Sequence, residues 1–211
     1  MSRSLSVAFV LPYGEPDPGF FPDTLIELCA AGAREAGHHA RIVRAYYDGR
    51  SAERDAEVRA RLGRWLAEQD ADVVAVERLF DPEPIAGHVG EAPGRVAVGL
   101  SWGSWDPVPG VEWVLGLASG QAAGGRTRRS PAAGDLSRAF ARLLDALAEG
   151  TDPLDVPGVA RVHQSGIESR HALEPAPLPA PFAPVLDHDV ICLRRRARQQ
   201  WRSRSREVRR R

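Results

Sequence analysis

The chain has few cysteines, no lysine and no long hydrophobic run. Its 211 residues include only Cys29 and Cys192, which are far apart, so a disulfide framework or a four-cysteine zinc site is excluded. No stretch approaches about eighteen apolar residues, and the first apolar run is too short for a signal sequence. These absences predict a soluble cytoplasmic protein with no membrane partner.

The charge of the chain is unevenly distributed. All 28 basic residues are arginines, and ten of them lie in the last eighteen positions, 194–211. A formal net charge of zero therefore combines a body of net charge −9 with a tail of net charge +9. Such asymmetry is typical of a nucleic-acid or membrane-surface arm. The complete absence of lysine indicates instead that the arginine-rich composition comes from GC-rich coding DNA.

Apolar runs alternate with helical periodicity through most of the chain. Near-continuous apolar runs predict five buried strands, at 5–12, 39–46, 72–79, 95–102 and 111–118. Helices are predicted at about 22–36, at 51–69 with Ser51 as N-cap, and from Asp135 as N-cap to Gly150. The segment 80–94 is rich in proline and glycine, so its crossover helix should be short or irregular.

This order predicts an α/β fold with a doubly wound, mainly parallel five-stranded sheet of the flavodoxin-like or Rossmann-like type. Helices then cover both faces, and ligands bind at the carboxyl ends of the strands. A hairpin is expected at 160–171, followed by a linker with five prolines. The chain divides into an α/β domain at 1–158, a hairpin and proline-rich linker at 159–193, and a tail at 194–211 that should be disordered.

The segment 140–160 combines the end of a helix, Gly150, a turn at Pro157 and Gly158, and the start of the hairpin. With the five-strand order and the proline-rich linker, it resembles the N-terminal cobalamin-binding domain of cobalamin-dependent radical SAM enzymes, over about residues 4–190. The resemblance implies cobalamin as the cofactor. In a full-length relative it also implies a catalytic barrel that binds S-adenosylmethionine and a [4Fe-4S] cluster.

The sequence departs from that family in two respects. The family has a Gly-x-His tip after strand four and a Gly-Glu-x-Glu element after strand five, whereas this chain has GLSWGS at 99–104 and GLASGQ at 116–121. No CxxxCxxC motif is present, so the chain lacks the thiolates for such a cluster. We therefore expect a truncated domain of a methyltransferase-type enzyme, not catalytic by itself, whose barrel is separately encoded or lost.

The candidate cofactor site consists of small and aromatic residues near the strand ends. A corrin is a broad, partly apolar disc with amide-bearing edges, so it needs a shelf of small residues and backbone N–H groups beside an aromatic wall. The candidates are Tyr13, Gly14, Gly99, Ser101, Trp102, Gly103, Ser104, Gly116, Ser119 and Gly120. The same residue types also form turns and pack at the rims of sheets. No Asp-x-His-x-x-Gly motif occurs, so histidine ligation of cobalt is disfavoured.

Several alternatives stay open. Residues 99–103 match Gly-x-Ser-x-Gly, which places Ser101 as the nucleophile of an α/β hydrolase, although nearby prolines disfavour the helix that this motif requires. The strand-end loops could serve another small ligand, and the arginine tail with Trp201 could bind nucleic acid. The patch Asp187, His188 and Asp189 with Cys192 lies in a linker, so no metal site is expected.

If the arginine-rich tail is a frameshifted reading of a longer gene, another reading frame of the coding DNA past residue 193 will encode a CxxxCxxC motif. GC-rich codons read out of frame tend toward arginine, alanine, proline and glycine. Translation of the two other frames checks this expectation, and the absence of the motif from both would contradict it.

Overall fold

The computed structural model describes residues 3–14, 24–47, 51–77, 96–100, 110–116, 133–163, 166–171 and 187–191. The strands are β1 (Ser6–Gly14), β2 (His39–Tyr47), β3 (Val73–Glu77), β4 (Val96–Leu100), β5 (Trp113–Leu115), β6 (Val159–His163), β7 (Gly166–Ser169) and β8 (His188–Ile191). The helices are α1 (Thr24–Glu35), α2 (Ala52–Glu68) and α4 (Ala133–Glu149), with a short 3₁₀ helix η1 (Pro153–Asp155).

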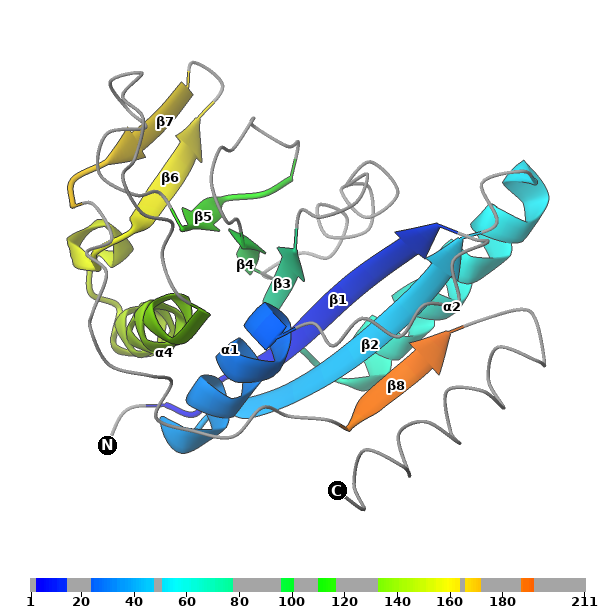
Figure 1. Ribbon diagram of the computed structural model, residues 1–211, viewed down its shortest axis with the longest axis horizontal. Coiled ribbons are helices and arrows are strands. Elements are labelled where there is room, and N and C mark those ends of the chain that lie inside the picture. Colours follow the sequence, from blue (N-terminus) through cyan, green and yellow to red (C-terminus); the bar gives the residue numbers. More distant parts are fainter. Residues whose placement is uncertain are drawn as a thin grey trace.

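The described strands form one sheet in the order β7-β6-β5-β4-β3-β1-β2-β8 (Figure 1). Strands β1 to β5 are mutually parallel and run 2-1-3-4-5 across the sheet, which is the flavodoxin-like order. The predicted α/β doubly wound fold is therefore confirmed. Three strands extend the expected five: the antiparallel hairpin β6–β7 beside β5, and β8, which pairs in parallel with β2.

Two apolar layers hold the helices against the sheet. Strand β1 contributes Val7 and Phe9 to the layer under α1 and α4, and Ala8 and Val10 to the layer under α2. The rings of Phe9 and Phe140 pack with centroids 5.1 Å apart, joining the central strand to α4. A strand that is buried on both faces has no side in contact with solvent and needs no alternation of polar and apolar residues. This explains the near-continuous apolar run at the start of the sequence.

Local sequence signals predicted most of the helix ends correctly. The Ser51 hydroxyl accepts a hydrogen bond from the Arg54 N–H (3.4 Å), as an N-cap should, and Gly150 follows α4 with φ +71°. The prediction that Asp135 caps α4 is wrong, because the helix begins at Ala133. Asp135 lies instead in the first turn of α4. Its carboxylate accepts a hydrogen bond from Arg138 (2.7 Å) and interacts favourably with the positive end of the helix dipole.

The strand boundaries differ more. Strand β1 is longer than predicted and reaches Gly14, while β5 ends at Leu115, before the end of its apolar run. The predicted last residues of β3 and β4 lie outside the described part of the chain. The placement of 187–189 in a linker is also wrong, because this segment enters β8 and pairs with the edge of β2. The segment combines polar residues at 187–189 with the apolar Val190 and Ile191, and its partner strand is almost 150 residues away. The predicted crossover at 80–94 lies outside the described residues.

None of the helices in the described part of the chain is long and apolar enough to cross a membrane.

Substitution of two glycines distinguishes the effect of backbone conformation on stability from the effect of steric room for a side chain. An added Cβ meets nothing within 4 Å at either Gly63, inside α2, or Gly150, but only Gly150 has a left-handed backbone. We expect Gly63→Ala to raise the free energy of unfolding by about 0.5–1 kcal/mol, and Gly150→Ala to lower it by about 1–2 kcal/mol. Urea unfolding of both variants tests this, and equal shifts would contradict it.

Candidate functional site

The carboxyl edge of the sheet contains a topological switch point, where the strand order reverses. Strands β2 and β3 lie on opposite sides of β1, so the connections from β1 and β3 leave in opposite directions. Ligands of open α/β sheets bind at such a switch point. Strands β3, β4 and β5 are in register, since Glu77 pairs with Leu100 and Leu100 with Leu115.

Strand β1 is paired with both of its neighbours in the described structure. Its pairing with β2 extends to Gly14 and Tyr47, and its described pairing with β3 extends to Val10 and Val76. Figure 1 shows the long arrows of β1 and β2 beside β3 and β4. The carboxyl edge is therefore formed by β1 and β2 on one side of the switch point and by β3, β4 and β5 on the other.

Four of the ten predicted cofactor residues belong to this edge in the described structure. Tyr13 and Gly14 end β1, Gly99 is the penultimate residue of β4, and Gly116 follows β5 with φ +119°. Gly99 is paired on both sides, with Val76 and Val114, and the Gly116 N–H donates to the Gly158 carbonyl (3.0 Å). The backbone groups of both glycines therefore take part in contacts within the sheet.

The other six predicted residues lie outside the described part of the chain, namely Ser101, Trp102, Gly103, Ser104, Ser119 and Gly120. The same is true of the residues that would complete a hydrolase motif around Ser101, and of the arginine tail. These remain predictions.

A buried tyrosine stands at the carboxyl end of β2. Tyr47 is 5% exposed and packs in the layer under α2, and its hydroxyl has no hydrogen-bond partner among the described residues. Burial raises the pKa of Tyr47 to about 12, with Arg59 opposing and Asp55 reinforcing this effect. The phenol is thus a neutral group throughout the physiological range.

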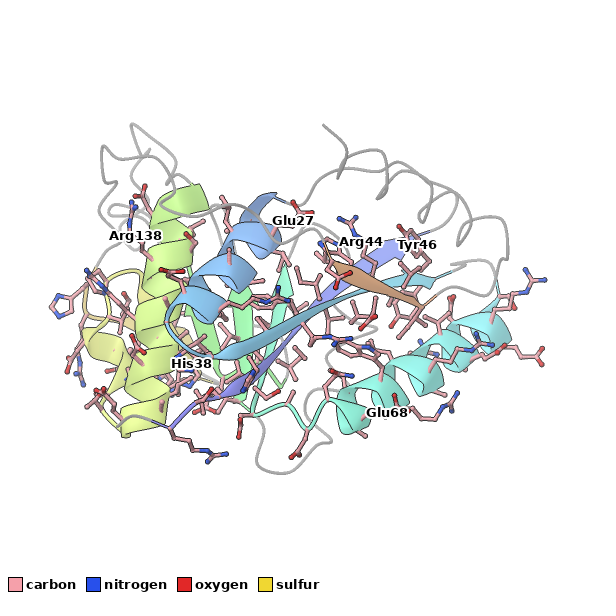
Figure 2. All side chains as sticks on the ribbon, turned by 90° about the horizontal axis from the view of Figure 1, so that it is seen from below. Glu27, His38, Arg44, Tyr46, Glu68 and Arg138 are labelled. Atoms are coloured by element: carbon pink, nitrogen blue, oxygen red, sulfur yellow. The ribbon has the colours of Figure 1, made fainter. Side chains whose placement is uncertain are left out.

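Sequence reasoning missed a buried group of charged and polar side chains beneath the first turn of α1. Arg44 Nε donates to His188 Nδ1 (2.8 Å), and Glu27 Oε1 lies 3.3 Å from His188 Nε2 and 3.7 Å from Arg44 Nη2. All three side chains are at most 2% exposed. Because Nδ1 accepts from Arg44, the neutral ring carries its proton on Nε2, facing Glu27. Figure 2 shows Glu27 on α1 and Arg44 on β2, beside the orange strand β8.

The next residue of β8 contacts the other face of the sheet. Asp189 Oδ2 accepts from Trp65 Nε1 and from Arg41 Nη2, each at 2.9 Å. Neighbouring residues of a strand point to opposite faces, so His188 and Asp189 cannot share one ion. Within the described residues, no group of three or more His, Cys, Asp or Glu side chains could hold a metal ion.

A second buried histidine lies at the far end of α1 from Glu27 (Figure 2). His38 Nδ1 accepts from the Leu5 N–H (3.1 Å), and its Nε2 lies 3.3 Å from Asp145 Oδ1 on α4. This contact joins the start of β1 to α4 at the amino edge of the sheet. It is therefore remote from the carboxyl edge, and its role is to join structural elements.

No protein-family model and no curated protein matches the sequence. Two solved structures of the radical S-adenosylmethionine methyltransferase TsrM from Kitasatospora setae are similar in chain course. One, with tryptophan substrate and a SAM analogue bound, is 14% identical over 81% of this chain and 31% of that chain, with a TM-score of 0.48. The other, with cobalamin and a [4Fe-4S] cluster bound, is 13% identical over 85% and 31%, with a TM-score of 0.49. The chain thus spans about a third of their length.

The state of Tyr47 gives a test of the edge of β2. Because its pKa is raised from 10.0 to about 12, its contribution to stability is complete below pH 10 and is lost as the pH rises through 12. We expect Tyr47→Phe to match or exceed the wild type in stability at pH 8, since the hydroxyl has no partner among the described residues. Between pH 10 and 12 the variant should gain up to about 2–3 kcal/mol on the wild type. Urea unfolding at pH 8, 10 and 11.5 measures the difference, and parallel pH profiles would contradict it.

Proposed function

We propose that this chain is a cobalamin-binding domain that receives the corrin at the carboxyl edge of its sheet, and that it has no catalytic activity alone. The observation that carries the proposal is the parallel 2-1-3-4-5 strand order, because this topology locates a ligand site at the switch point between β1 and β3. The in-register strands β3, β4 and β5 would present their carboxyl ends together to a broad, flat ligand.

The choice of cobalamin among possible ligands comes from the segment that follows the fifth strand. Here α4, Gly150, η1, the turn at Gly158 and the β6–β7 hairpin follow one another in the order of the motif that resembles the family. Both Gly150 (φ +71°) and Gly158 (φ +83°) have backbone conformations that favour glycine, so the two turns of the motif have a physical requirement for that residue.

The residues at the edge would act by shape. Gly99 and Gly116 would leave room over β4 and β5, and Tyr13 and Gly14 would border the ligand on the β1 side. Trp102 would supply an aromatic wall, and Ser101, Gly103, Ser104, Ser119 and Gly120 would supply small side chains and backbone donors in the loops. The described residues near the edge include no histidine suited to ligate cobalt, since His188 already contacts Arg44 and Glu27.

A bound cobalamin would carry a methyl group, or assist radical chemistry, on a substrate held by another domain. That domain would be a radical SAM barrel with its own S-adenosylmethionine and iron–sulfur cluster, because this chain lacks the CxxxCxxC motif. The contribution of this chain would be to bind and orient the corrin.

Titration of the purified chain with hydroxocobalamin, followed by absorbance, tests the proposal. We expect saturable binding with a base-off spectrum, because the chain offers no motif for histidine ligation. Substituting Ser101, Gly103 or Gly120 by leucine should weaken binding at least tenfold by filling the strand-end loops.

The matched control is Gly63→Leu, which adds the same side chain in open space on α2, away from the carboxyl edge. It should bind as the wild type does. Absence of binding by the folded wild-type chain would overturn the cobalamin proposal and leave the hydrolase reading of Ser101 to be tested with ester substrates.

A further inference from the structure

Strand β8 is a short edge strand that returns to the sheet from far along the chain. It pairs with β2 over four residues, from Ile42 with His188 to Ala45 with Ile191. It is the last strand in the sheet order and follows β7, at the opposite edge, by way of residues outside the described part. Because β8 is parallel to β2, the chain leaves Ile191 toward the carboxyl edge.

The contacts that hold β8 are largely polar. On one face His188 lies between Arg44 of β2 and Glu27 of α1, and on the other Asp189 accepts from Trp65 and Arg41. Ile191 is the one apolar side chain among the described residues of β8 that is buried, while Val190 is half-buried. One apolar anchor gives little free energy against the ordering of five residues, so docking depends on the polar contacts.

The same contacts make release of β8 feasible. Arg44 and Glu27 are at most 2% exposed in the docked state, so their burial carries a desolvation cost. The desolvation of these charges therefore offsets part of what the docked contacts contribute. The parallel core strands have no such compensation, since their faces are apolar.

We propose that residues 187–191 form a releasable clasp, whose docked state depends on insertion of His188 between Glu27 and Arg44. In the docked state β8 covers the edge of β2. In the released state β8 leaves that edge, and the rest of the sheet stays folded. The clasp goes beyond the proposed function.

Hydrogen–deuterium exchange of the full chain tests the clasp. In His188→Ala, amides of 187–191 should exchange at least tenfold faster than in the wild type, while β1 and β4 stay unchanged. His188→Asn should show a smaller increase, because the asparagine Oδ1 can replace Nδ1 as the acceptor for Arg44. The control His163→Ala removes an exposed histidine of β6 and should leave 187–191 unchanged.

Asp189→Asn, on the opposite and more exposed face, gives a second test with a milder change and should also accelerate exchange of 187–191 alone. The clasp would be overturned by equal exchange in the wild type and His188→Ala, or by unprotected amides at 187–191 in the wild type. It would also be overturned if β1 and β4 lost protection together with β8 in both variants, because β8 would then be an integral part of the fold.

Discussion

Pairing of β1 with β2 on one side and β3 on the other is the constraint from which the arrangement follows. Right-handed connections between parallel strands then place α1 and α2 on opposite faces, because the chain first moves one way from β1 and then returns past it. The central strand consequently supplies both apolar layers, Phe9 to one and Val10 to the other. The same pairing of β1 with β2 and β3 creates the switch point at the carboxyl edge.

The two edges of the sheet are completed in different ways. Beside β5 the hairpin β6–β7 reverses direction, and Arg161 lies over the Trp113 ring at 4.4 Å, so an aromatic face and a cation support the antiparallel pair. Beside β2 the polar strand β8 covers what would otherwise be the exposed edge of a long strand. The β6–β7 hairpin is local in sequence, whereas its pairing with β5 and the pairing of β8 with β2 join distant segments of the chain.

Buried charge explains why the β2 edge is specific. Burying an arginine is costly unless partners satisfy it, and loss of one partner from a buried ion pair typically costs about 3–5 kcal/mol. Arg44, a buried charge on β2, contacts both a carboxylate from α1 and an imidazole from β8. If β8 were shifted by one residue against β2, His188 and Asp189 would point to the opposite faces of the sheet. The polar contacts therefore also define the register of β8.

The sequence alone determined the α/β class, the first five strands, the helices and the hairpin, because apolar periodicity, Ser51 and Gly150 are local signals read within a few residues. It also pointed to the strand-end glycines, since parallel strands bring their carboxyl ends together. Only the tertiary structure decided the strand order and the entry of 187–191 into the sheet. It alone joined Glu27, Arg44 and His188, because their contacts span up to 161 positions of the sequence and no local pattern records which distant charges meet.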